Sequence, residues 1–95
     1  MIIVRDVFQA KYGKGSDLAA HFKETKEWSI QYAPRILTDA SGPFFTVVTE
    51  TEFESLAAFE QESGAIFSMP EFGDWFGRMT QLVESGRREF YNIEM

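Results

Sequence analysis

The fold can be predicted from the stretch FFTVVTETEFESLAAFE, residues 44–60. Aromatic and β-branched residues in its first half are typical of a strand, and the second half begins a helix. Side chains of a strand point alternately to opposite faces of the sheet. Phe44 and Val48 therefore point to one face, and Val47 and Phe53 to the other. Such a strand, apolar on both faces, predicts a sheet that is covered on both sides.

The rest of the chain supplies the other elements of a small α+β domain. Residues Ser16 and Asp17 are candidate caps for a first helix, and Pro34 ends it. Each β-α-β passage needs a crossover helix and implies parallel strand neighbours, whereas the central hairpin implies an antiparallel pair. The order β-α-β-β-α-β predicts a ferredoxin-like sandwich, with an antiparallel sheet and the helices on one face. We expect strands over 2–10, 35–40, 44–53 and 87–95, and helices over 18–33, 55–62 and 68–84. Ser68 and Glu71 are expected to form a capping box, and Gly86 to stop the last helix.

Composition narrows the class of protein. Residues 1–95 form one domain, in which 44% apolar residues can build a core. A net charge of −6 argues against binding to nucleic acid or to an anionic membrane surface. The chain has no cysteine, no apolar run of membrane-spanning length and no signal-peptide pattern, because Arg5 and Asp6 follow MIIV. A cytoplasmic protein is expected.

The two-faced strands predict a homodimer. The first strand also carries apolar residues on both faces, Val4 and Phe8 on one and Ile3 and Val7 on the other. Two helices can cover only one face of a single sheet, and a large exposed apolar patch usually marks an interface. We therefore expect two copies to pack sheet against sheet.

Four segments resemble the dimeric α/β-barrel superfamily, in particular its NIPSNAP-like and antibiotic-biosynthesis-monooxygenase-like small proteins. They are VRDVFQAKYGKGSDLAAHF, RILTDASGPFFTVVTETEF, ESLAAFE and VESGRREFYNIE. The resemblance covers nearly the whole chain as a pattern of elements and turns, without a catalytic motif. It implies a homodimer whose sheets form a central barrel, and a small-ligand cavity between sheet and helices. Members include cofactor-free oxygenases of quinol-like compounds, haem-degrading proteins, isomerases and proteins without an assigned activity.

Three residues are candidates for catalysis. His21, the only histidine, would suit a general base at neutral pH, or it could lie at the rim of the first helix's apolar stripe. The resemblance implies that Trp75 forms a wall beside a substrate and that Arg78 stabilises a substrate anion. The alternative for Trp75 is ordinary core packing. The resemblance also disfavours haem degradation. Haem-binding members are expected to carry an axial histidine on the second helical region and haem-degrading members an asparagine on the first strand, and this sequence has neither.

Four further residues are candidates for ligand binding. Trp28 and Tyr32 follow His21 along the first helix, and Phe76 lies on the second helical region. Glu50 is expected to reach the solvated end of its strand, yet it is the carboxylate there that could serve a cavity. Polar side chains within the strands, Arg5, Asp6, Tyr91 and Asn92, could orient a ligand or meet a second copy.

No metal or organic cofactor is predicted. One histidine supplies too few nitrogen donors for a zinc site, and no phosphate-binding or nucleophile motif is present. Two hypotheses remain open. The chain is an enzyme that acts without cofactor on a small, largely apolar aromatic or polyketide-like molecule, or it is a non-catalytic dimeric module for ligand binding, stress response or assembly.

Overall fold

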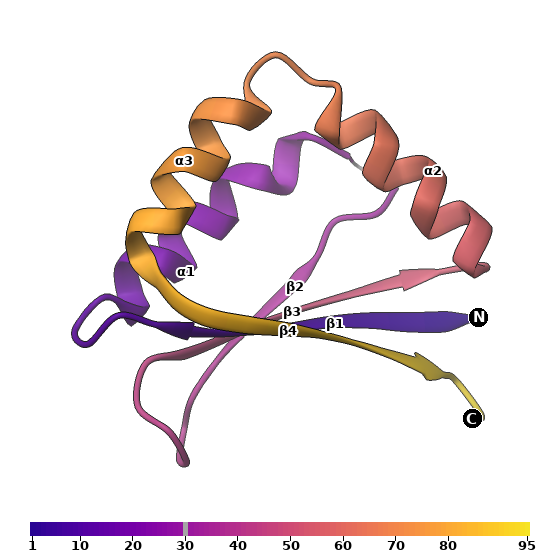
Figure 1. Ribbon diagram of the computed structural model, residues 1–95. Helices are drawn as coiled ribbons and strands as arrows, with labels where there is room; N and C mark the ends of the chain where they lie inside the picture. The colour runs from indigo at the N-terminus through magenta and orange to yellow at the C-terminus, as the bar shows by residue number, and fades with distance from the viewer. Residues whose placement is uncertain (30) are drawn as a thin grey trace.

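The computed structural model describes residues 1–29 and 31–95, which form one layer of sheet and one layer of helices (Figure 1). The described residues confirm the predicted ferredoxin-like α+β fold. The strands are β1 (Ile2–Ala10), β2 (Arg35–Thr38), β3 (Thr46–Phe53) and β4 (Val83–Asn92). The helices are α1 (Gly15–Lys23), the 3₁₀ turn η1 (Glu24–Glu27), α2 (Leu56–Phe67) and α3 (Phe72–Leu82).

The strand order is β2-β3-β1-β4, and every neighbouring pair is antiparallel. β1 and β2, which α1 connects, both run antiparallel to β3 between them. They are therefore parallel to each other but are not neighbours, which corrects the expectation of parallel neighbours. β3 and β4 are related in the same way, with β1 between them. Each crossover thus skips one strand position, and all the helices lie on the same face of the sheet (Figure 1).

The first helix is shorter than predicted. α1 begins after Lys14 without a side-chain cap, so neither Ser16 nor Asp17 has the predicted role. It ends at Lys23 and tightens into η1 instead of running to residue 33. The Thr25 hydroxyl donates to the Phe22 carbonyl at 2.7 Å and so competes for an acceptor of the helix. Ile30, within the predicted helix, lies outside the described residues.

The second helical region also differs from prediction in its boundaries. Ser55 caps α2 by accepting a hydrogen bond from the Ala58 amide at 3.1 Å. The helix then continues through residues 63–65, because one interior glycine costs only about 1 kcal/mol. The predicted capping box is wrong: the Ser68 hydroxyl donates to the Gly64 carbonyl at the end of α2, and Glu71 makes no side-chain cap. Gly86 does not stop a helix either, since β4 already begins at residue 83.

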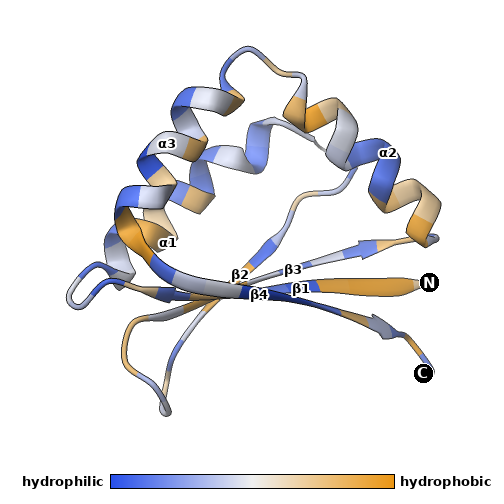
Figure 2. Ribbon diagram, in the orientation of Figure 1, coloured by the Kyte–Doolittle hydropathy of each residue, from blue (hydrophilic) through white to orange (hydrophobic). Residues whose placement is uncertain are grey.

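The core lies between the sheet and the helices. Leu18 and Val47 are completely buried at its centre. Figure 2 shows that α2 is apolar at both ends and hydrophilic in its middle, and α2 has no buried residue. No helix among the described residues is long and apolar enough to cross a membrane. The core cluster consists of Ala10, Leu18, Ala19, Phe22, Val47 and Trp75.

Candidate functional site

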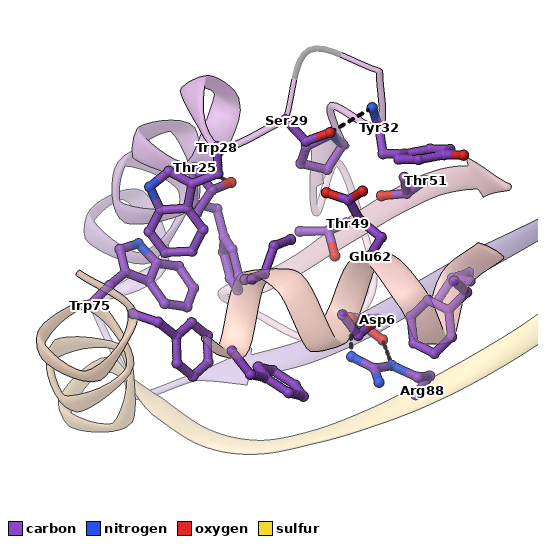
Figure 3. Close-up of a pocket in the computed structure, with 18 of the residues that line it drawn as sticks. Asp6, Thr25, Trp28, Ser29, Tyr32, Thr49, Thr51, Glu62, Trp75 and Arg88 are labelled. Carbon is purple, nitrogen blue, oxygen red and sulfur yellow. Dashed lines mark hydrogen bonds and ion pairs between the residues drawn. The ribbon is translucent and has the colours of Figure 1, made fainter. Parts of the chain in front are cut away.

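A pocket of about 280 Å³ lies between the helices and the helix-covered face of the sheet. Its volume is close to the lower end of the ≈300–1,000 Å³ that small-molecule sites occupy. β1, β3 and β4 contribute side chains from the sheet, and α2, α3 and the segment from α1 to β2 surround them (Figure 3). Much of the lining is aromatic or otherwise apolar, including Trp28, Phe53, Phe59, Phe72, Trp75 and Met79.

Hydroxyl and carboxylate groups gather at another part of the pocket. Thr49 and Thr51 point from β3 toward the helices, because they are two residues apart on one strand. Glu62 reaches toward them from the hydrophilic middle of α2. Ser29 and Tyr32 complete this polar group (Figure 3), which we call the polar end of the pocket. The lining therefore combines an apolar surface for a ring system with groups that can orient it.

An ion pair occupies the sheet below the pocket. Arg88 on β4 donates to both carboxylate oxygens of Asp6 on β1, at 2.7 and 3.0 Å (Figure 3). These hydrogen bonds from its own guanidinium hold the pKa of Arg88 above its ordinary value. The Arg88 guanidinium also lies 5.0 Å from the centre of the Phe59 ring. Both charges of the pair are thus matched within the protein.

Trp75 belongs to the pocket wall and to the core at once. Its indole Nε1 donates to the backbone carbonyl of His21 at 3.0 Å, which fixes the ring relative to α1. The Trp28 ring meets it edge to face, with the ring centres 5.3 Å apart. Trp75 therefore packs in the core and also lines the pocket. A role of Trp75 beside a substrate stays a prediction.

His21 lies outside this pocket. It is buried and stacks on Trp75 with ring centres 4.5 Å apart. Its Nε2 lies 2.8 Å from the Trp75 carbonyl oxygen, and its Nδ1 lies 2.8 Å from a Glu24 carboxylate oxygen. Both ring nitrogens already have protein partners, so the ring joins α1 to α3 rather than reaching a ligand. The placement does not support His21 as a base in this pocket.

Arg78 also lies away from the pocket. Its guanidinium is 3.8 Å from Glu24, and its side chain is largely exposed on the outer side of α3. Of the three catalytic candidates, only Trp75 lines this pocket. His21 and Arg78 instead line a separate, more open hollow together with Glu24. The predicted ligand-binding residues Trp28, Tyr32 and Phe76 do come together around the pocket between the helices and the sheet.

Glu50 faces the opposite, helix-free side of the sheet. It lies opposite Arg5 on β1 and Arg35 on β2 in the strand register. Arg5 Nε donates to it at 2.8 Å and Arg35 Nη2 at 2.5 Å. The hydrogen bond from Arg35 is the main cause that lowers the pKa of Glu50, and Arg5 adds to it. Its side chain is only 5% exposed, so the prediction that it reaches solvent is wrong.

Several residues that line the pocket were not predicted from the sequence. Thr49 and Thr51 share a strand face with Val47, and this period of two could have identified them as helix-facing. Glu62 had no comparable signal, because an exposed glutamate and a pocket glutamate look alike in a helix. Arg88 had no such signal either, because its partner Asp6 is 82 residues away in the sequence. Among the described residues, no group of three or more His, Cys, Asp or Glu side chains is placed to hold a metal ion.

Comparison with known proteins identifies the fold and not the family. No family model and no curated protein matches the sequence. A NIPSNAP domain protein from Burkholderia xenovorans superposes with a TM-score of 0.86 at 14% identity, over 98% of this chain and 94% of that one. A NIPSNAP family protein from Agrobacterium tumefaciens gives 0.81 at 16% identity, over 96% and 90%.

A provisionally assigned antibiotic biosynthesis monooxygenase from Nitrosomonas europaea gives a TM-score of 0.76 at 14% identity, over the full length of both chains. The predicted resemblance to these two groups of small proteins is confirmed at the level of fold. Identity this low does not carry an activity from one chain to another. The chain therefore has the fold shared by NIPSNAP proteins and antibiotic-biosynthesis-monooxygenase-like proteins.

Proposed function

We propose that this protein binds a small, largely apolar aromatic molecule in the pocket between its helices and its sheet. The observation that supports this is the pocket itself, which is lined mainly by aromatic side chains and by a few polar groups. Burying a planar ring there would remove apolar surface of both partners from water, at roughly 25 cal/mol per Å². Aromatic pairs add about 0.5–1.5 kcal/mol beyond that burial.

The two tryptophans provide a direct test. The chain has no other tryptophan, and both Trp28 and Trp75 line the pocket. Titration with naphthalene is expected to shift both indole N–H signals in a ¹⁵N-correlated NMR spectrum. Ser63→Phe should weaken binding by filling part of the pocket. Gln61→Phe, on the same helix but outside the lining, is the matched control. Unchanged indole signals at saturating naphthalene would contradict the proposal.

We also propose that two copies pair through the helix-free face of the sheet. Ile3, Val7 and Val48 lie on this face, and Leu37 and Tyr91 are exposed there. The hairpin loop between β2 and β3 projects on the same side (Figure 1). The charges of this face balance, which suits a second copy of the same surface better than a charged partner. They are Arg5, Arg35 and Arg87 against Glu50, Glu52 and Glu89.

Two exposed leucines give a matched test of the dimer. Leu37 is 37% exposed on the helix-free face, and Leu56 is 51% exposed at the start of α2. Leu37→Glu should convert a dimer to a monomer in light scattering, because it places a charge inside the interface. Leu56→Glu should leave the mass unchanged. A wild-type protein that is monomeric at micromolar concentration would refute the pairing.

A second candidate function is cofactor-free oxygenation of the bound molecule. Trp75 in the wall and the shared fold favour it over other reactions. A polycyclic quinol would supply the electrons: its ring CH₂ and O₂ would become a ring C=O and H₂O. Oxygen uptake with such a quinol should then exceed the uncatalysed rate and fall in Ser63→Phe. Tight binding without any oxygen uptake would leave the non-catalytic module as the function.

A further inference from the structure

The polar end of the pocket contains groups whose hydrogen bonding is incomplete. Ser29 Oγ accepts a hydrogen bond from the Tyr32 amide at 3.1 Å, and Asp6 is held by Arg88. Within the described residues, the Glu62 carboxylate and the hydroxyls of Thr49 and Thr51 make no side-chain hydrogen bond to the protein. They face the pocket and are free to bind a ligand (Figure 3).

The chemistry of these free groups is asymmetric. A carboxylate accepts hydrogen bonds and donates none, whereas a threonine hydroxyl can do either. The group of the ligand that meets Glu62 must therefore be a donor. A ligand carboxylate at the same place would meet another carboxylate and would be repelled.

The net charge of the pocket lining also favours a hydrogen-bond donor or a cation over an anion. Arg88 is the only arginine or lysine among the described residues that line it, and Asp6 already neutralises that charge. Glu62 then leaves the lining with one unmatched negative charge. The faces of Trp28 and Trp75 also carry the negative part of the ring quadrupole, which favours a cation over an anion.

From this geometry we infer that the pocket selects an aromatic molecule bearing a hydrogen-bond donor, a protonated amine or a phenolic hydroxyl, and rejects its carboxylate analogue. The donor binds Glu62 at the polar end while the ring contacts the aromatic lining. This inference rests on the proposed binding function and specifies the ligand class of the same pocket.

Four probes with one ring system separate the possibilities. They are naphthalene, 2-naphthol, 2-naphthylmethylamine and 2-naphthoic acid, measured at pH 7 by calorimetry, with the two indole N–H signals confirming occupancy of the pocket. We expect the amine or the naphthol to bind at least about tenfold more tightly than the acid, because one hydrogen bond to a charged group accounts for that ratio. Whichever donor binds more tightly identifies the head group.

Glu62→Gln should reduce this preference to within about threefold, because its amide can both donate and accept. Glu60→Gln, an exposed change of the same charge on the same helix and outside the pocket lining, should keep it. Equal binding of the acid, or a preference that survives Glu62→Gln, would overturn the inference while naphthalene binding still supports the proposed function. If none of the four probes binds, naphthalene included, both the proposed function and this inference are overturned.

Discussion

Charged side chains are paired and buried differently on the two faces of the sheet. On the helix-covered face, Asp6 and Arg88 form one bidentate pair beside a pocket. On the helix-free face, Glu50 lies beneath two arginines, Arg5 and Arg35, whose side chains are 42% and 70% exposed. The covered face gains its stability from apolar packing and leaves Glu62 unmatched. The open face instead buries a carboxylate without any helix above it. A carboxylate can thus be buried by long side chains of its own sheet.

Two neighbouring valines offer the largest expected contrast between the faces. Val47 is completely buried under the helices, whereas Val48 is half-buried on the open face. Val47→Ala should lower the free energy of unfolding by about 2–3 kcal/mol, through lost burial and a new cavity. Val48→Ala should cost less than about 1 kcal/mol in dilute protein.

Denaturant titration of both alanine variants measures the contrast. If the effect of Val48→Ala grows with protein concentration, the residue is buried by a second copy, which supports the proposed dimer. Equal effects of the two substitutions at every concentration would contradict the assignment of covered and open faces.

Glu50 and Glu52 give a similar contrast within the open face. Glu50→Gln should cost about 1.5–3 kcal/mol, because it removes charge-assisted hydrogen bonds from a buried group. Glu52 is exposed, so Glu52→Gln should change stability by no more than about 0.5 kcal/mol. Chemical unfolding at pH 7 measures both. A larger loss of stability in Glu52→Gln than in Glu50→Gln would contradict the assignment of Glu50 as the carboxylate that the two arginines bind.

Acid should weaken the open face. The pKa of Glu50 is held below its ordinary value of 4.5, chiefly by the hydrogen bond from Arg35. Its contribution to stability is therefore present above pH 4.5 and is lost as the pH falls through the lower, folded value. Arg87 lowers the pKa of Glu89 in the same sense.

Melting temperatures between pH 6 and pH 3 test this effect. Wild-type protein should lose stability on acidification, and Glu50→Gln should lose less over the same range. Glu52→Gln should follow the wild type. Parallel curves for the wild type and Glu50→Gln would show that Glu50 is not the group that titrates.

The smallest expected effect concerns α2, the least buried helix of the covered face. Ser55→Ala removes its side-chain cap and should cost about 1 kcal/mol. Loss of the cap should raise hydrogen exchange in the first turn of α2. Because α2 carries Glu62, binding of the naphthylmethylamine probe should also weaken slightly. Ser16→Ala, near the start of α1, is the control, since that helix has no side-chain cap. Equal exchange in both variants would contradict the role of Ser55.

Local sequence signals predicted the elements well and their boundaries less well. β1 matches its predicted range, because a run of β-branched and aromatic residues has one consistent period. The long first helix was wrong because its periodic pattern continued past Thr25, whose hydroxyl bonds back to the helix. Gly64 does not break α2, since tertiary context tolerates a single glycine.

The pocket could be predicted only in part. Trp28, Tyr32, Trp75 and Phe76 were identifiable as aromatic side chains of the two helical regions, and they do line it. His21 was a candidate because of its chemistry, and only the fold places the Trp75 carbonyl and Glu24 against its two nitrogens. A residue type shows which reactions are available to it, whereas its partners determine whether it is free to perform them.

By itself, the sequence determined the order β-α-β-β-α-β and the presence of two apolar sheet faces, because periods of 2 and 3.6 residues and turn signals act over short distances. Only the tertiary structure determined the partners of Glu50, Asp6 and His21, whose side-chain contacts reach residues up to 82 positions away. Such contacts depend on which strands become neighbours. That choice is made by packing of the whole chain, and no local pattern encodes it.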